Sequence, residues 1–182
     1  QVIVAVAPQH AAKLLATHRA TAPLAARIAA YAFEPIGTVY AAYPPELRLP
    51  LPMLGLDGGK ASAIGQWVFD RGSLGDAAGL LSFVLSGHGA WQELANDALL
   101  TCLHGELEAT LGRQLPFPTW HCIIRERRAT YSCRPKLVRP SAETAIPGLW
   151  LAGDYVCPDY PATLEAAVRS GVAAARAIMQ SR

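Results

Sequence analysis

The stretch GLWLAGDY occupies residues 148–155 and is followed, after four residues, by YPATLEAAVRSG at residues 160–171. The apolar start of the first stretch predicts a short β-strand that ends at Gly153 and Asp154. Open α/β sheets bind their ligands at the carboxyl ends of strands, and a glycine there lets a ligand approach the backbone because it has no Cβ. Asp154 is therefore a candidate ligand-binding carboxylate.

The second stretch predicts a long amphipathic helix over residues 160–180. Pro161 suits its first turn, where the missing N–H would have no partner anyway. The free N–H groups near Ala162, Thr163 and Leu164, with the positive end of the helix dipole, suit an electron-rich acceptor. We expect the helix to pack on a sheet through the residues with 3–4 spacing, which are Leu164, Ala167, Val168, Gly171, Val172, Ala175 and Ile178.

The order of strand, glycine, aspartate, loop and helix is also a common connection in α/β proteins. An aspartate after a glycine is often only a turn residue. The pattern by itself therefore leaves a ligand site and an ordinary turn equally open.

The rest of the chain predicts a mixed α/β fold. Residues 1–7 form an apolar run typical of a buried strand, and helical spacing follows at residues 9–16 and 22–31. The middle of the chain is typical of antiparallel strands, at residues 36–43, 63–70, 80–86 and 120–131. A helix is expected over residues 88–111, ending at Gly112, with an apolar face made of Trp91, Leu94, Ala98, Cys102, Leu107 and Leu111.

The composition excludes several classes of protein. The formal net charge of the 182 residues is +2, which is too balanced for a nucleic-acid-binding surface. Apolar residues make up 52% of the chain, so a large apolar cavity or surface is expected, but no run is long enough to span a membrane. The four cysteines have neither the C-x-x-C spacing of a metal or redox site nor the density of a secreted disulfide scaffold, and a reducing, cytoplasmic location is expected.

The two stretches quoted first closely resemble the C-terminal FAD motif of phytoene desaturases and flavin amine oxidases. Upstream, RATY at residues 128–131 and RP at residues 139–140 match the pattern that precedes this motif in plant-type carotenoid desaturases. GQWVFDRG at residues 65–72 is similar to a substrate-domain segment of the squalene-associated branch, the hydroxysqualene dehydroxylases. The resemblance covers most of the chain from Val2 onward.

The resemblance implies roles for five residues. Gly153 and Asp154 would hold the ribityl-pyrophosphate part of FAD, and the helix start at Ala162, Thr163 and Leu164 would face the flavin pyrimidine carbonyl. Such a helix dipole stabilises negative charge on the flavin as it accepts electrons. No catalytic acid or base is implied, because hydride transfer to the flavin is the chemistry of the cofactor. A dehydroxylation would need a proton donor, which the sequence does not identify.

The resemblance also implies an architecture. Residues 1–34 and 142–182 would form a partial FAD-binding Rossmann-type domain, and residues 35–141 an inserted antiparallel β-rich substrate domain. The family's G-x-G-x-x-G fingerprint for the ADP half of FAD is absent, and Gly87-His88-Gly89, the nearest imitation, has Gln92 in the third glycine position. We therefore expect the C-terminal part of a longer protein, which carries little or no FAD by itself.

Other candidate sites have weaker patterns. Cys102, His104, His121, Cys122 and Cys133 match no common zinc-site spacing, so no metal site is expected. A hydrolase is not indicated, because the nucleophile motif G-x-S-x-G is absent. Arg125, Arg127 and Arg128 alternate with Glu126, which is typical of a solvated strand face, with a contact near the cofactor or to anionic lipid as the alternative.

These observations predict an FAD-dependent oxidoreductase that acts on a long apolar isoprenoid, with squalene-type substrates first and carotenoid precursors second. The expected partners are that substrate and the surface of the cytoplasmic membrane, and nucleic acid is not among them. Two alternatives remain open. One is a flavin oxidase for amines or protoporphyrinogen, and the other is a non-catalytic module that binds an apolar ligand or a partner protein.

Overall fold

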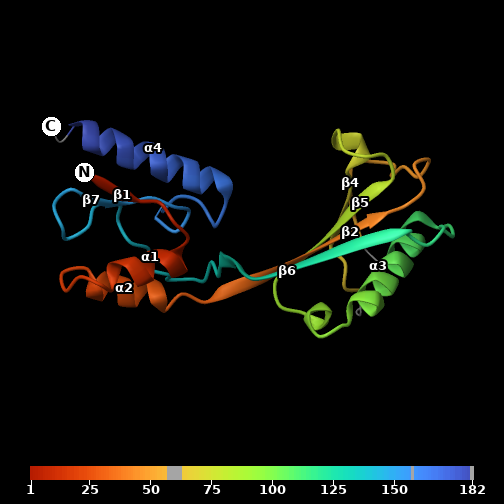
Figure 1. The fold of residues 1–182 in the computed structure, drawn as a ribbon, viewed down its shortest axis with the longest axis horizontal. Helices are drawn as coiled ribbons and strands as arrows, with labels where there is room; N and C mark the ends of the chain where they lie inside the picture. The colour runs from red at the N-terminus through yellow and green to blue at the C-terminus, as the bar shows by residue number, and fades with distance from the viewer. Residues whose placement is uncertain (57–62, 157, 181–182) are drawn as a thin grey trace. The chain divides into compact units, whose positions relative to one another are not determined.

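The computed structural model describes residues 1–56, 63–156 and 158–180 of the chain (Figure 1). Its elements, in chain order, are β1 (Val2–Val4), α1 (Pro8–Leu15), α2 (Ala22–Ala29), β2 (Phe33–Ala42), β3 (Met53–Gly55), β4 (Trp67–Asp70), η1 (Gly72–Leu74), β5 (Leu80–Ser86), η2 (Ala90–Gln92), α3 (Asn96–Leu111), β6 (Trp120–Tyr131), β7 (Leu149–Leu151) and α4 (Leu164–Gln180). Within the described ranges, no helix is both long enough and apolar enough to cross a membrane.

The chain divides into two compact units. The first combines Gln1–Phe33 with Thr130–Arg182, and the second is Glu34–Ala129. Residues 130–141, which we expected in the second part, lie with the first, because Tyr131 is buried in its core and the Ser132 N–H donates to the Ala32 carbonyl at 2.9 Å. The cofactor and substrate roles of the two parts stay predictions.

The first unit contains a parallel pair of strands, β1 and β7, in which Val2 pairs with Leu149 and Val4 with Leu151. The helices α1 and α2 pack on each other, and their buried residues share a core with Tyr131, Leu151 and Tyr155. The expectation of a buried strand at residues 1–7 is wrong for the described chain, since Val2 is 59% exposed. Among the described strands β1 pairs with β7 alone, so most of its side chains stay exposed.

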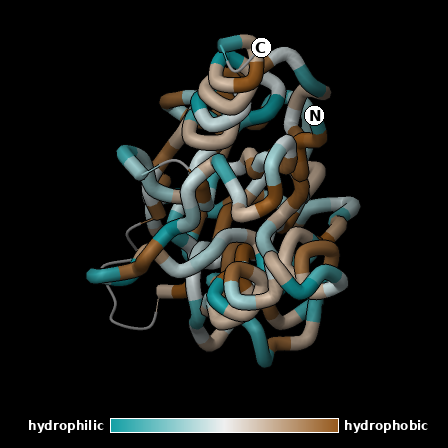
Figure 2. The backbone as a smooth tube through the Cα atoms, turned by 90° about the vertical axis from the view of Figure 1, so that its left-hand side faces the viewer, coloured by the Kyte–Doolittle hydropathy of each residue, from teal (hydrophilic) through white to brown (hydrophobic). Residues whose placement is uncertain are grey.

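The helix α4 begins at Leu164, later than expected. Thr163 caps it, because its Oγ1 accepts a hydrogen bond from the Ala166 N–H at 3.2 Å, and Pro161 therefore precedes the helix. The buried face is also different from the expected one and consists of Ala166, Ser170 and Ala174. Leu164 and Val168 are 89% and 62% exposed. Hydrophobic and hydrophilic residues alternate along α4, which ends at the label C in Figure 2.

The second unit is a five-stranded sheet in the order β3-β4-β5-β2-β6, and α3 lies along one of its faces (Figure 1). The neighbours β3–β4, β4–β5 and β5–β2 are antiparallel. The strands β2, β5 and β6 confirm the predicted ones, whereas β3 was not predicted and β4 begins at Trp67 instead of residue 63. Its core lies between sheet and helix and includes Val39, Val68, Phe83, Leu99 and Leu103.

The helix α3 begins at Asn96, eight residues later than predicted. Trp91 belongs to the separate turn η2, where its ring packs over Gly37 so closely that a Cβ there would lie 2.8 Å from the Trp91 ring. The predicted apolar face started from Trp91 and was therefore out of phase. Ala98 and Cys102 are exposed, and the buried face consists of Leu99, Leu100, Leu103, His104 and Leu107.

Candidate functional site

Gly153 and Asp154 lie directly beyond the carboxyl end of β7, as predicted. The Gly153 φ is +154°, and a Cβ at this position would lie 2.5 Å from Cε1 of Tyr155, so a larger residue does not fit. The Gly153 N–H donates a hydrogen bond to Oγ of Ser170 at 3.0 Å, which ties the strand end to α4. Asp154 is therefore held in a fixed place between strand and helix.

The Asp154 carboxyl group is partly buried, and this has an electrostatic cost. Burial raises the pKa of Asp154 above its ordinary value, although the backbone N–H groups of Tyr155 and of Asp154 itself, and the charge of Arg139, act in the opposite direction. A ligand that donates a hydrogen bond would stabilise the ionised form. Asp154 thus suits contact with a hydroxyl group better than isolation in the apo chain.

Two further features surround Asp154. The Tyr131 hydroxyl donates to the Asp154 backbone carbonyl at 3.4 Å. The Tyr155 hydroxyl is buried and has no hydrogen-bond partner in the described part of the chain, and burial raises the pKa of Tyr155. An orphaned buried hydroxyl beside the candidate carboxylate is unusual in a native structure and is consistent with a missing polar partner.

The start of α4 presents unpaired backbone donors. Within the described residues, the N–H groups of Thr163, Leu164 and Glu165 donate no hydrogen bond. Ala162, which we expected to be free as well, donates to Sγ of Cys133 at 3.4 Å. The helix start therefore offers its donors at Thr163 and Leu164, next to the positive end of the dipole, to an electron-rich acceptor.

Sequence reasoning missed the residues that connect the two halves of this site. Tyr131 contacts Asp154, Cys133 contacts Ala162, and the Arg139 guanidinium donates to the Tyr160 carbonyl and lies 5.3 Å from the Tyr131 ring centre. The segment 131–139 thus touches both Asp154 and the loop before α4. The sequence did contain a signal for two of these residues, because RATY at residues 128–131 includes Tyr131 and RP at residues 139–140 includes Arg139, and both carry part of the resemblance.

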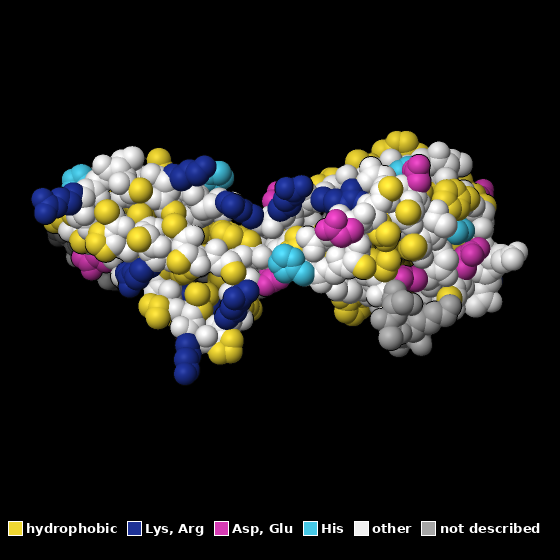
Figure 3. Space-filling view, turned by 90° about the horizontal axis from the view of Figure 1, so that it is seen from below, with side chains coloured by type: hydrophobic (Ala, Val, Ile, Leu, Met, Phe, Trp, Pro, Cys, Tyr) yellow, Lys and Arg dark blue, Asp and Glu magenta, His cyan; other side chains and the backbone are white. Residues whose placement is uncertain are grey.

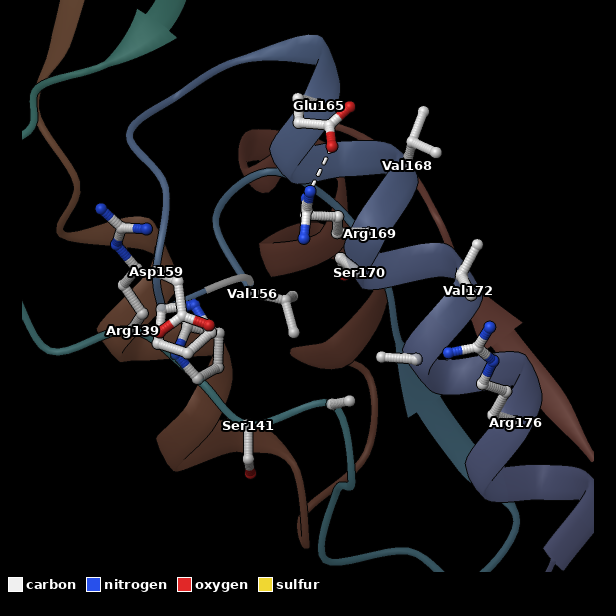
Figure 4. A pocket seen from close by; sticks show the side chains of 14 residues that line it. Arg139, Ser141, Val156, Asp159, Glu165, Val168, Arg169, Ser170, Val172 and Arg176 are labelled. Carbon is white, nitrogen blue, oxygen red and sulfur yellow. Dashed lines mark hydrogen bonds and ion pairs between the residues drawn. The ribbon is translucent and has the colours of Figure 1, made fainter.

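A cavity of about 760 Å³ lies beside this site in the first unit. It is lined by the loop 139–142, by Val156 and residues 158–159, and by α4 (Figure 4). None of the five predicted residues lines it. Charged side chains from both sides border it, namely Arg139, Asp159, Glu165, Arg169 and Arg176.

The two units differ in charge. The first carries nine Lys and Arg residues against four Asp and Glu, and the second carries seven against ten. On the face shown in Figure 3, dark blue side chains accordingly predominate over the first unit, and magenta ones gather on the second. The first unit is therefore the one whose charge suits an anionic ligand.

His104, one of the residues whose spacing was compared with zinc sites, makes other contacts. His104 is buried, with its Nδ1 3.1 Å from the Tyr43 hydroxyl and its Nε2 3.5 Å from Glu108, so it connects α3 with the residue that directly follows β2. Cys157 lies outside the described residues. Among those that are described, no group of three or more His, Cys, Asp or Glu residues could hold a metal ion.

This chain is similar in sequence to several curated proteins. A hydroxysqualene dehydroxylase of Rhodopseudomonas palustris is 35% identical over 101 residues, which are 54% of this chain and 24% of that protein. A zeta-carotene desaturase of Synechocystis is 30% identical over 106 residues, or 57% of this chain and 22% of the relative.

Solved structures share the fold at 15% identity. A putative protoporphyrinogen oxidase from Exiguobacterium has a TM-score of 0.69, with 100% of this chain and 41% of that chain covered. A putrescine oxidase variant gives 0.61, with 100% and 43% covered. The family described as flavin containing amine oxidoreductase matches residues 1–179. This chain therefore belongs to that family of FAD-dependent oxidoreductases.

Proposed function

We propose that the complete protein binds FAD and oxidises or reduces a long apolar isoprenoid, with squalene-type substrates first and carotenoid precursors second. The matched residues of this chain span about a quarter of the length of the curated relatives. The proposal therefore rests on two features within it, the donors around Asp154 and the open face of the sheet in the second unit.

The residues around Asp154 fit the flavin half of FAD. The free N–H groups of Thr163 and Leu164 suit a flavin carbonyl oxygen, and the Asp154 carboxylate suits a ribityl hydroxyl. The buried hydroxyl of Tyr155, the residue that follows Asp154, lacks a partner in the described chain and is a further polar group that a ligand could satisfy. When bound, FAD supplies the hydride chemistry, and these residues hold and orient it.

The observation that carries the substrate proposal is the open face of the sheet in the second unit. The face opposite α3 contains two rows of paired residues across four strands, which are Met53, Phe69, Ser82 and Tyr40, and Gly55, Trp67, Val84 and Thr38. The edge strand β6 adds Trp120, Cys122 and Ile124 on one side, because Ile123 between them packs into the core under α3. Trp67 and Trp120 are 44% and 54% exposed.

This open face suits a hydrocarbon chain. Neither row contains a charged residue, and apolar side chains predominate, so a bound ligand must be apolar to replace the water that now covers them. A hydroxysqualene dehydroxylase and a zeta-carotene desaturase are among the relatives, and both names specify isoprenoids. We therefore assign the open face to the substrate.

One end of the open face is polar. Glu34 on β2 and Glu126 and Arg128 on β6 lie at the end of the strands where the chain passes into the first unit. Nε2 of His88 lies 3.8 Å from a carboxylate oxygen of Glu34. An isoprenoid alcohol would place its hydroxyl there, and the Glu34–His88 pair would supply the proton that expels water.

A charge in the middle of the open face tests the substrate proposal. We expect Val84→Lys in the complete gene product to reduce turnover of dispersed hydroxysqualene by about ten-fold or more, mainly through KM, because a lysine there must be desolvated. Leu74→Lys, on the exposed turn η1, is the matched control and should leave turnover unchanged. Equal turnover by the two variants would contradict the assignment.

The same assay separates the alternatives. Turnover of an amine or of protoporphyrinogen in place of isoprenoids would make the protein a flavin oxidase of another kind. Binding of squalene without flavin reduction or reoxidation by any of these compounds would make it a non-catalytic module. Wild type must first bind FAD for either outcome to be assigned.

We also propose that the protein works in the cytoplasm at the surface of the membrane that holds its substrate. Exposed apolar side chains and a basic first unit both favour docking to anionic lipid. Co-sedimentation of the complete gene product with vesicles of anionic phospholipid should exceed that with neutral vesicles. Equal recovery in the supernatant with and without vesicles would rule the docking out.

A further inference from the structure

The loop before α4 is fixed at Tyr160 by two arginines. The Arg139 guanidinium donates a hydrogen bond to the Tyr160 backbone carbonyl. The Arg169 guanidinium lies over the Tyr160 ring, 4.7 Å from its centre. Glu165 in turn orients Arg169, since its carboxylate accepts a hydrogen bond from Nε at 2.6 Å. The backbone and the side chain of Tyr160 are thus held from two different segments.

The two arginines lie on opposite sides of the cavity described above. Figure 4 shows Arg139 on the side of the loop 139–142 and Arg169, joined to Glu165, on the side of α4. A guanidinium is planar and stacks on aromatic rings while its N–H groups donate hydrogen bonds. Arg139 uses both properties, because it also lies over the Tyr131 ring at 5.3 Å from the ring centre.

The contacts of Arg139 and Tyr160 affect both candidate flavin contacts, the start of α4 and Asp154. Tyr160 stands three residues before Thr163, whose free N–H opens α4, so the position of Tyr160 determines where these donors point. Tyr131, under Arg139, donates to the Asp154 carbonyl, and the charge of Arg139 acts on the Asp154 carboxyl group. Removing Arg139 would therefore loosen the helix start and change the field at Asp154 together.

We infer that Arg139 is a positioning residue for the cofactor, which acts with Arg169 by clamping Tyr160 so that the N–H groups at the start of α4 keep their direction toward the flavin. The inference rests on the proposed function, in which this helix start meets FAD. Arg139 itself contacts the loop and Tyr131 and need not contact the flavin.

The test compares three variants of the complete gene product. Arg139→Met should weaken FAD binding by about ten-fold or more, because a charge-assisted hydrogen bond and a stacking contact are lost. It should also make the midpoint potential of the bound flavin more negative, since donors and positive charge that stabilise the reduced flavin are displaced. Arg139→Lys keeps the charge and should recover part of both properties. Arg134→Met, an exposed arginine of the same segment, is the matched control.

A second measurement tests, in the absence of flavin, whether Arg139 fixes the loop before α4. In the 182-residue chain, amide hydrogen exchange at residues 162–167 should be about ten-fold faster in Arg139→Met than in Arg134→Met, because the loop opens locally. Unchanged exchange together with unchanged FAD affinity and potential would overturn the inference. A merely structural role would lower occupancy and melting temperature but leave the potential of the bound flavin unchanged, which also overturns it. If wild type binds no FAD but amide exchange still differs between Arg139→Met and Arg134→Met, the proposed function is contradicted, whereas the fixation of Tyr160 by Arg139 is supported.

Discussion

Asp154 is a carboxylate whose surroundings in the apo chain favour its neutral form. Burial raises its folded-state pKa, so its stabilising contribution is complete below the ordinary carboxyl pKa and is lost as the pH rises through the folded value. At neutral pH the ionised group therefore costs stability. Such a cost is typical of a residue kept for ligand binding, because evolution rarely selects for maximal stability at a site.

Asp154→Asn tests this cost in the 182-residue chain. We expect the variant to gain melting temperature relative to wild type as the pH is raised from about 3 to 7, since the amide has no charge to desolvate. Thermal melts at a series of pH values measure the difference. Asp159→Asn, on the exposed neighbouring loop, should show no such trend, and a constant gap between Asp154→Asn and wild type would contradict the electrostatic argument.

Ser170 is the buried link between α4 and the strand end. Its Oγ accepts the Gly153 N–H at 3.0 Å, and the residue is 5% exposed. Ser170→Ala leaves that N–H without a partner and should lower the free energy of unfolding by about 1 to 3 kcal/mol. Denaturant unfolding gives the value, and the exposed Ser141→Ala should cost about 0.5 kcal/mol or less.

At the scale of elements, α4 shows where sequence periodicity succeeds and where it fails. The helix itself could be predicted, because its apolar and small residues follow helical spacing over residues 164–180. Its buried face could not, because alanines and a serine pack against the unit while Val168 and Val172 stay exposed. Hydrophobicity alone ranks valine above alanine, but close approach to a backbone selects the smaller side chain.

Two substitutions distinguish the observed face of α4 from the predicted one. Val168→Ser in the 182-residue chain should change the free energy of unfolding by about 0.5 kcal/mol or less, because the side chain is 62% exposed. Ala174→Leu should destabilise by about 1 to 3 kcal/mol, because Ala174 has no exposed surface and the added atoms overpack the contact. Chemical denaturation of both variants measures these free energies of unfolding. A larger loss in Val168→Ser than in Ala174→Leu would contradict the observed face and support the predicted one.

The candidate site was predicted in its parts but not in its connections. Gly153, Asp154 and the donors of Thr163 and Leu164 could be named, because strand, turn and helix signals are local in sequence. The contacts of Tyr131, Cys133 and Arg139 join segments more than twenty residues apart, and local patterns hold no information on them. The start of the helix was misplaced because Pro161 resembles a first-turn residue, whereas the Thr163 side chain makes the cap.

At the scale of the whole molecule, we propose a different role for each of the two units. The first unit is basic and presents the donors that we propose for the flavin, and the second presents a sheet face whose paired rows are uncharged, which we propose for a hydrocarbon. Because FAD also has an ADP half, which this chain has no fingerprint to hold, we expect the 182-residue chain alone to bind FAD far more weakly than the complete gene product. Flavin absorbance after purification of each compares the two.

The central claim is that Asp154 and the start of α4 hold the flavin, and one titration tests it directly. FAD is added to the apo form of the complete gene product as wild type, Asp154→Ala and Asp159→Ala, and binding is followed by flavin fluorescence with thermal melts alongside. The loss of a charge-assisted hydrogen bond, about 1.5 to 3 kcal/mol, should weaken FAD binding by roughly ten-fold to a hundred-fold in Asp154→Ala. Asp159→Ala should bind like wild type. Equal FAD affinity of Asp154→Ala and wild type, with only the melting temperature lowered, would contradict the account and make Asp154 a turn residue.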